Sequence, residues 1–238
     1  MREIVIRENP EQYMQELRKW VQETLNTKPE GMCSFFTSRI DNYEEHMAYW
    51  AEAYDRLTEL LPKDAEDILD LGCGTGLDME AIFKVLPDAY ITGIDINAEM
   101  LTALKKKFRN KGIELYCADY FKKILPENSF DVIVAFETLH HFTKEPKKGL
   151  YEKLYKSLRK GGIFIMVEYI ACCDEEEVLL FETERKLREK WKIKEEFIHF
   201  DMPMTLEHEI MLLRVAGFEK VEAVDSIKGA TFVISTRE

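Results

Sequence analysis

The sequence contains little of what marks disulfide-bonded, zinc-binding or membrane-spanning proteins. Only five of its 238 residues are cysteine. Because their number is odd and no Cys-x-x-Cys pair occurs, neither a disulfide framework nor a zinc site is indicated. No apolar run approaches the roughly 20 residues that a membrane span requires, and the first residues lack the long apolar stretch of a signal peptide. These absences predict a soluble, cytoplasmic protein in a reducing compartment.

Positive charge is scarce relative to negative charge. The chain carries 33 Lys and Arg residues against 45 Asp and Glu residues, a net charge of -12. Because phosphate backbones attract basic surfaces, an acidic chain is a poor default nucleic-acid binder. The densest basic cluster, in residues 105–111, is interpreted as a solvated helix face. Hydrophobic residues make up 46% of the chain, which is enough for a sizeable buried core.

Hydrophobic spacing divides the chain into a helical N-terminal part and a part in which strands and helices alternate. Apolar residues at three-to-four spacing predict helices at about residues 10–25, 42–61, 77–86, 98–109, 147–159, 175–195 and 205–216. Short apolar runs predict strands at about residues 68–71, 90–94, 113–118, 131–136, 163–167, 218–224 and 231–235. Alternating strands and helices imply right-handed crossovers and a parallel sheet.

A glycine-rich turn follows the first predicted strand, in the run Asp70-Leu71-Gly72-Cys73-Gly74-Thr75-Gly76. Clustered glycines between a strand and a helix let the backbone approach a ligand closely, and the helix N-terminus offers unpaired N–H groups to an anion. The Gly-x-Gly-x-Gly spacing differs from the dinucleotide fingerprint, and no Gly-Lys-Ser/Thr follows as in a phosphate loop. The turn therefore favours a ligand with a carboxylate and a nucleoside but no phosphate.

Acidic residues stand at the predicted carboxyl ends of the next two strands. Asp95 lies 19 positions beyond Gly76, where a carboxylate can accept hydrogen bonds from both ribose hydroxyls. Dinucleotide enzymes use an acid in the same way, so Asp95 alone does not distinguish the two cofactors. Asp119-Tyr120 at the end of the third strand does, because a carboxylate can accept from an adenine amino group beside an aromatic ring.

These motifs resemble those of the class I S-adenosylmethionine-dependent methyltransferases. Asp70 to Gly76 matches their first motif, Asp95 the acidic end of their second strand and Asp119 their adenine-binding position. The similarity covers about residues 40–170 and is closest to small-molecule enzymes, with a methyltransferase domain similar to the ubiquinone/menaquinone-biosynthesis-like group. It implies that S-adenosylmethionine is the cofactor and S-adenosylhomocysteine the product. The cofactor-binding residues that it implies are Asp70, Gly72, Cys73, Gly74, Gly76, Asp95, Ile96, Asp119, Tyr120 and Phe136.

The expected fold is α/β, a Rossmann-like doubly wound sheet of about seven strands. Most of these strands are expected to be parallel, with an antiparallel last strand, and a helical cap is expected at the N-terminus. We expect residues 1–62 to form this cap or lid. Residues 63–238 are expected to form the S-adenosylmethionine-binding domain, with a helical insertion at about 172–205.

Methyl transfer from a sulfonium is an in-line displacement that depends mainly on positioning, which can supply roughly 7–11 kcal/mol. We therefore expect neither a catalytic triad nor a metal. A base helps if the acceptor is a protonated oxygen or nitrogen. His140 and His141 are the candidates, because they follow the fourth strand in Phe136-Glu137-Thr138-Leu139-His140-His141, a segment that faces the methyl group in the family. The competing interpretation is that they line the pocket or start a helix.

The acceptor pocket is expected to form from segments outside the common core. Residues 39–47 resemble the N-terminal lids of small-molecule methyltransferases, and Arg39 can pair with a carboxylate. The candidate substrate and lid residues are Arg39, Tyr43, Trp50, Tyr54 and Tyr169. Helix packing for the aromatic residues and a surface charge for Arg39 are equally good interpretations.

Two other functional classes stay open. The first is a nicotinamide-dependent oxidoreductase, which the glycine spacing and Asp119 disfavour. The second is a catalytically inactive regulatory protein that binds S-adenosylmethionine. Enzymes that methylate amino groups of nucleic acids are expected to carry an Asn/Asp-Pro-Pro-Tyr-like segment after the fourth strand. This chain has no such segment there. The expected partner is therefore a small-molecule methyl acceptor, with neither nucleic acid nor membrane, and the chain is expected to be a monomer or homodimer.

Overall fold

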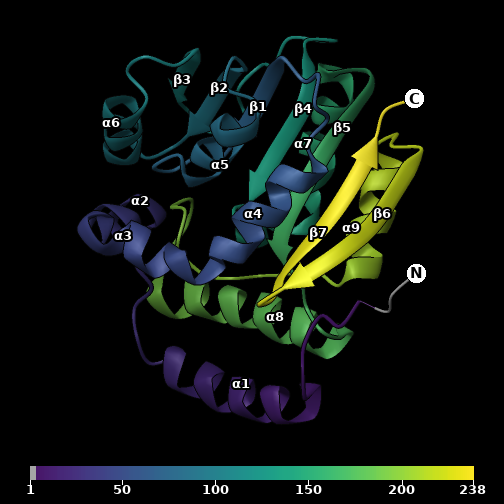
Figure 1. Cartoon of the computed structure of the whole chain (residues 1–238). Helices are drawn as coiled ribbons and strands as arrows, with labels where there is room; N and C mark the ends of the chain where they lie inside the picture. Colours follow the sequence, from purple (N-terminus) through teal and green to yellow (C-terminus); the bar gives the residue numbers. More distant parts are fainter. Residues whose placement is uncertain (1–3) are drawn as a thin grey trace.

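One mixed sheet with the strand order β3-β2-β1-β4-β5-β7-β6 forms the centre of the computed structural model, which describes residues 4–238 (Figure 1). Its strands are β1 (Asp67–Leu71), β2 (Tyr90–Asp95), β3 (Ile113–Cys117), β4 (Phe130–Phe136), β5 (Leu158–Tyr169), β6 (Lys220–Ile227) and β7 (Ala230–Thr236). Strands β1 to β5 pair in parallel, whereas β7 runs antiparallel to both β5 and β6. The expected seven-stranded Rossmann-like fold is thus confirmed.

Two hydrophobic clusters cover the two faces of the sheet, because successive strand residues point to opposite sides. On one face, Ile68 packs with α4 (Ala51–Leu60), α5 (Leu77–Val85) and α6 (Ala98–Lys107). On the other face, Leu69 packs with α7 (Lys144–Ser157) and α9 (Leu206–Val215). Strands buried on both faces read as continuous apolar runs, which is why β1 and β4 were predictable.

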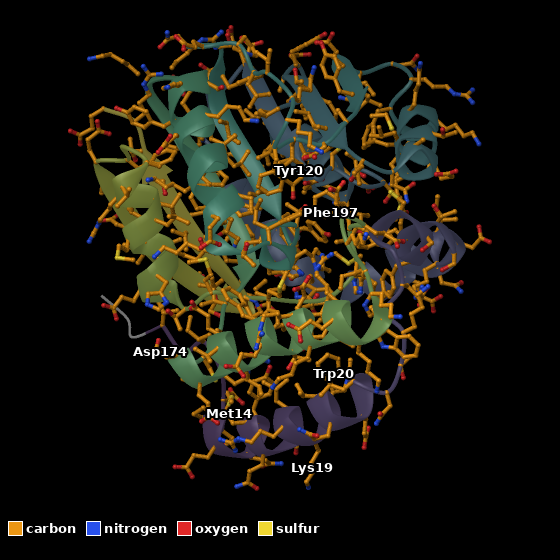
Figure 2. All side chains as sticks on the ribbon, turned by 180° about the vertical axis from the view of Figure 1, so that it is seen from behind. Met14, Lys19, Trp20, Tyr120, Asp174 and Phe197 are labelled. Atoms are coloured by element: carbon orange, nitrogen blue, oxygen red, sulfur yellow. The ribbon has the colours of Figure 1, made fainter. Side chains whose placement is uncertain are left out.

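A third cluster joins the N-terminal helix to the helix inserted after β5. Helix α1 (Pro10–Thr24) packs on α8 (Asp174–Trp191) through Met14, Leu17 and Val21. Figure 1 shows the pair below the sheet, on the side where α2 (Met32–Thr37) and α3 (Ile40–Met47) also lie. In Figure 2, Lys19 lies on the side of α1 that faces away from α8. The first three residues of the expected cap lie outside the described part of the chain.

The N-terminal helices differ from the prediction in two places. Helix α2 was not expected, and the single helix predicted over 42–61 is divided into α3, the 3-10 turn η1 (Ala48–Trp50) and α4. Trp50 leaves the helical region with φ −95° and ψ 17°, which redirects the chain between α3 and α4.

Helix α8 ends at Trp191 instead of near 195, because Lys192 adopts a left-handed conformation with φ 55°. Within residues 4–238, no helix is both long and apolar enough to cross a membrane.

Candidate cofactor and acceptor site

The glycine turn joins β1 to α5 with a backbone that glycine favours. Gly72, Gly74 and Gly76 have φ values of 69°, 48° and 80°, in the left-handed region where a Cβ atom is costly. The Gly72 N–H donates to the Ile94 carbonyl over 2.7 Å, which holds the turn against β2. Gly76 caps α5 and lies so close to Phe108 that an added Cβ would come within 2.8 Å of that ring. The missing side chains at these three glycines therefore let the backbone of the turn lie close to a ligand or to neighbouring residues.

Replacing Gly72 with alanine is expected to destabilise the fold by about 1–3 kcal/mol, the cost of one strained backbone conformation. A Cβ atom at Gly72 would also overlap the Thr138 side chain, so cofactor affinity should fall as the turn shifts. Thermal unfolding with and without S-adenosylhomocysteine measures both effects. Gly149→Ala is the matched control, because nothing lies within 4 Å of a Cβ at that helical position; it should stabilise by up to ~1 kcal/mol. Equal behaviour of the two variants would contradict the account of the turn.

Asp95 orients the turn with a carboxylate that already accepts two backbone hydrogen bonds. Gly74 N–H donates to Oδ2 over 2.9 Å, and Asn97 N–H donates to Oδ1 over 2.7 Å. The cap of α6 is a different residue, because the Asn97 side chain accepts from Glu99 N–H and Met100 N–H. Asp95 is therefore not the cap of α6. Its carboxylate lies at the wall of a cavity, with lone pairs available for hydroxyl groups.

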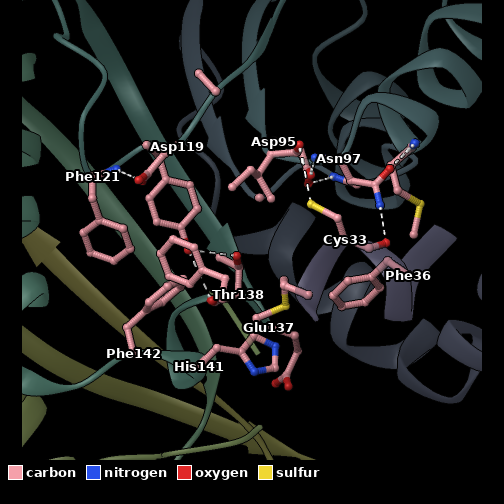
Figure 3. Close-up of a pocket in the computed structure, with 18 of the residues that line it drawn as sticks. Cys33, Phe36, Asp95, Asn97, Asp119, Phe121, Glu137, Thr138, His141 and Phe142 are labelled. Carbon is pink, nitrogen blue, oxygen red and sulfur yellow. Dashed lines mark hydrogen bonds between the residues drawn. The ribbon is translucent and has the colours of Figure 1, made fainter. Parts of the chain in front are cut away.

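This first cavity runs along the carboxyl ends of β1, β2 and β4 (Figure 3). Asp119 forms one end, where its Oδ1 accepts from Phe121 N–H over 2.9 Å. Tyr120, Phe121 and Phe142 form an aromatic group there, with ring centroids 4.5–5.9 Å apart. Such rings suit the face of a planar base. The open volume is about 90 Å³, and Met32, Cys33 and Phe36 of α2 form part of its cover.

Three carboxyl groups, those of Asp70, Asp78 and Asp95, gather beneath the glycine turn. Both carboxylate oxygens of Asp70 are buried without a hydrogen-bond partner. Burial and the neighbouring Asp78 raise the pKa of Asp70 well above its usual range, and burial likewise raises the pKa of Asp78 to about 6. Asp95 adds to the same field. An added pyrophosphate would increase the repulsion that raises these pKa values, whereas a cationic ammonium or sulfonium would relieve it and favour the ionised carboxylates. The residues present therefore fit S-adenosylmethionine better than a dinucleotide.

A second, larger cavity of about 630 Å³ adjoins the first. The two cavities share the side chains of Phe36, Tyr43, Glu137 and His141 in their walls. Figure 3 shows Glu137 and His141 side by side at one end of the first cavity. The second cavity is also lined by aromatic residues and histidines from distant segments, among them Phe35, His46, Trp50, His140, Tyr169 and His199. This arrangement places one ligand space directly beside another.

Glu168, at the carboxyl end of β5, holds the segment that carries the two histidines. Its carboxylate accepts from the backbone N–H groups of Thr138, Leu139 and His140 over 2.7–3.2 Å. It also contacts His140 Nδ1 at 2.7 Å, and its exposed fraction is 1%. These bonds satisfy the N-terminal N–H groups of the 3-10 turn η2 (Leu139–His141). Glu137, just before it, has φ 51°, a strained value for a non-glycine residue.

Burial and mutual charge set the ionisation of this cluster. Burial lowers the pKa of His140, but the hydrogen bond and charge of Glu168 outweigh it and raise that pKa to about 9. Burial raises the pKa of Glu137 to about 8. Burial alone would raise the pKa of Asp201, but the adjacent histidines outweigh burial and hold that pKa below its usual range. Burial and the charge of His141 lower the pKa of His199 to about 4. Perturbed groups concentrated in one cavity are typical of a functional site.

Most of the predicted site residues meet in these two cavities. Those that line the first are Gly72, Gly74, Asp95, Ile96, Asp119, Tyr120 and Phe136. Those that line the second are Arg39, Tyr43, Trp50, His140, His141 and Tyr169. The Arg39 guanidinium pairs with Glu30 over 2.7 Å and lies over the Phe35 ring.

Four predicted residues lie behind the cavity walls. Asp70 and Cys73 are buried beneath the turn, and Gly76 packs against α6 and the Phe108 that follows it. Tyr54 was proposed as a lid residue, but it stacks on Phe136 with ring centroids 4.3 Å apart and belongs to the core on that face of the sheet. Its stacking supports the wall of the first cavity from behind.

Sequence reasoning missed several residues of the site. Glu168 gave a signal, because it is a charged residue inside the apolar run Ile163–Tyr169, where a polar side chain needs a buried partner. Glu137 and Thr138 lie within the motif after the fourth strand, but the motif predicted no separate role for either residue. Arg7, Tyr13 and Asp201 come from segments whose local patterns carry no sign of their meeting at one cavity.

The chain is similar to known methyltransferases over its central part. A family model described as a methyltransferase domain matches residues 68–162. A malonyl-acyl-carrier-protein O-methyltransferase of Acetivibrio thermocellus is 29% identical over 165 residues, which span 68% of this chain but 56% of that protein. A carboxy-S-adenosyl-L-methionine synthase of Campylobacter lari is 27% identical over 200 residues, 77% of this chain and 84% of that protein.

The fold is also similar to that of a solved methyltransferase. Human N-acetylserotonin methyltransferase, solved with S-adenosylmethionine, superposes with a TM-score of 0.66 and 21% identity over 91% of this chain and 62% of that one. The strand order, the glycine turn and the acids at the ends of β2 and β3 agree with these similarities. Together, the family model, the two relatives and the fold support a class I S-adenosylmethionine-dependent methyltransferase.

Proposed function

We propose that this protein transfers the methyl group of S-adenosylmethionine to a small-molecule acceptor bound in the second cavity. The observation that carries the proposal is the shared wall of the two cavities, formed in part by Glu137 and His141. When bound, S-adenosylmethionine supplies a methyl group on a positively charged sulfur. An acceptor atom attacks the methyl carbon, the carbon–sulfur bond breaks, and S-adenosylhomocysteine leaves as the acceptor loses its proton.

The described residues divide the binding of the cofactor between them. Asp95 would accept from the ribose hydroxyls with the lone pairs that its two backbone donors leave available. Asp119 would accept from the adenine amino group, with Tyr120 and Ile96 against the ring. The backbone of Gly72 and Gly74 would hold the methionine portion. Tyr43 lines both cavities and would separate the cofactor from the acceptor.

The second cavity favours an acceptor with an aromatic or apolar body and an anionic group. Its volume of about 630 Å³ suits a small molecule. The Arg7 guanidinium stacks on Tyr13 at 4.1 Å, and its buried Nε has no hydrogen-bond partner within residues 4–238. Arg39, in contrast, is already paired with Glu30. Arg7 can therefore bind a carboxylate of the acceptor.

Transfer of a labelled methyl group from S-adenosylmethionine to components of a metabolite extract tests this proposal. We expect at least one labelled small molecule with the wild-type chain and none with the Asp95→Ala variant. Acidic acceptors should predominate among the products. If the chain binds S-adenosylhomocysteine but labels nothing across extracts of different growth conditions, the regulatory-protein alternative is supported and the proposal fails.

The setting of the reaction is proposed as cytoplasmic. All five cysteines are free thiols, including the neighbouring Cys172 and Cys173. Free thiols are typical of reducing compartments. The charge of -12 supports a small acceptor over a nucleic acid.

A further inference from the structure

Three side chains at the edge of the second cavity present potential metal ligands to one point. His140, His141 and Asp201 each offer an imidazole nitrogen or carboxylate oxygen, and these atoms all lie within 4.8 Å of one another. Asp201 Oδ1 lies 3.1 Å from His141 Nδ1 and 3.7 Å from His140 Nε2. Ligand atoms on a four-coordinate zinc ion, at about 2.0–2.1 Å from the metal, are roughly 3.3 Å apart. The Asp201 distances are therefore close to those of a formed site.

The backbone fixes the two segments against each other. Met202 N–H, directly after Asp201, donates to the His140 carbonyl over 2.6 Å. The exposed fractions of His140 and His141 are 6% and 7%. The three ligands thus lie on segments that are joined by a hydrogen bond, although they are 60 positions apart in the chain.

One ligand atom of the cluster is buried without a well-aligned hydrogen bond. Asp201 Oδ1 is itself buried, although 43% of the Asp201 side chain is exposed, and His141 Nδ1 lies 3.1 Å from it and 3.4 Å from the Phe200 carbonyl. A buried carboxylate oxygen without a donor is costly. A cation among the three side chains would remove that cost.

Glu168 completes the arrangement from behind His140. Its contact with His140 Nδ1 leaves Nε2 as the ring nitrogen on the side of Asp201. Metal-binding histidines almost always donate their other ring N–H to a carboxylate or carbonyl, which fixes the orientation of the ring. Glu168, held by three backbone N–H groups, has this position.

We propose that His140, His141 and Asp201 bind a divalent transition-metal ion. Two imidazoles and one carboxylate are a ligand set of Zn²⁺ and Fe²⁺, and three protein ligands leave positions open for a substrate. The open side faces the second cavity. His199 is near, with its ring centroid 5.0 Å from that of His141, but it is stacked on Phe35 and is not part of the ligand set.

The role of the ion rests on the proposed function, whereas its binding does not. An ion held by these residues would lower the pKa of an acceptor hydroxyl and favour loss of its proton to water. The acceptor oxygen would then take the methyl group as the carbon–sulfur bond of the cofactor breaks. The histidines would act through the metal and not as free bases. This replaces the expectation that the site has no metal.

Titration of the metal-free chain with Co²⁺ and Zn²⁺ tests the site without an activity assay. We expect one equivalent of Co²⁺ to give visible d–d absorption without a thiolate charge-transfer band, and one equivalent of Zn²⁺ to displace it. His140→Ala and Asp201→Ala should each lower the affinity by at least about 100-fold, and Glu168→Gln by about 10–100-fold. His208→Ala is the control, because His208 pairs with Glu177 elsewhere and should leave the affinity unchanged.

Binding of S-adenosylhomocysteine, measured on the same variants, shows that they are folded. Absence of stoichiometric metal binding, or equal binding by wild-type, His140→Ala and Asp201→Ala chains, would overturn the site. Unchanged methyl transfer after metal removal would overturn the role of the ion. A chain that binds the metal as described but transfers no methyl group would overturn the proposed function and leave the site intact.

Discussion

The Asp95→Ala variant is expected to bind S-adenosylhomocysteine about 10²–10⁴-fold more weakly than the wild-type chain. The proposed contacts are two hydrogen bonds between a carboxylate and ribose hydroxyls, each worth about 1.5–3 kcal/mol, or about 3–6 kcal/mol together. The variant also loses the acceptors of Gly74 N–H and Asn97 N–H, which orient the glycine turn. Isothermal calorimetry measures the change directly.

Asp88→Ala is the matched control for this experiment. Asp88 precedes the amino end of β2, is exposed, and lies at the opposite end of the strand from Asp95. The same substitution there should leave the dissociation constant within about twofold. Asp95→Ala with near wild-type affinity and a normal unfolding temperature would show that the ribose is held by another residue.

Replacing Lys147 with methionine is expected to lower the free energy of unfolding by about 3–5 kcal/mol. Lys147 and Glu209 form an ion pair between α7 and α9, and both are almost fully buried. Tyr151 also donates to Glu209 over 2.8 Å. Removing the lysine leaves an uncompensated carboxylate in the core, which is the reason for the large effect. Urea denaturation gives the difference in free energy.

The double variant Lys147→Met/Glu209→Leu separates the buried charge from the lost packing. Because a buried ion pair can often be replaced by apolar residues at little cost, the double variant should recover at least half of the loss. Lys148→Met, at the exposed neighbouring position, should change stability by no more than about 0.5 kcal/mol. A double variant less stable than Lys147→Met would contradict this explanation.

The sheet was predictable because its signal is local. Ile68 to Leu71, apolar except for Asp70, and the apolar run Val132 to Ala135 are fully buried, and such runs between turn residues indicate strands. The N-terminal helices were harder to predict. The break at Trp50 involves no proline or glycine, and α2 is a six-residue helix whose Met32 N–H is held by the distant Phe197 carbonyl. Local spacing does not contain that contact.

The residues of the candidate site likewise divide into those with a local sequence signal and those brought in by distant contacts. Asp95 and Asp119 were found because the carboxyl ends of neighbouring parallel strands meet at one edge of a sheet. Asp201 and Arg7 reach the second cavity only through the packing of α8 and of the N-terminal segment. The buried Arg7 Nε and Asp201 Oδ1 atoms, which make no hydrogen bond to the described residues, are properties of the folded chain.

Calorimetric titration with S-adenosylmethionine, S-adenosylhomocysteine and NAD tests the central claim most directly, because it asks which cofactor the site at Asp95 and Asp119 accepts. The account predicts stoichiometric binding of both sulfur compounds, loss of that binding in Asp95→Ala, and no detectable binding of NAD. Tight binding of NAD without binding of either sulfur compound would contradict it.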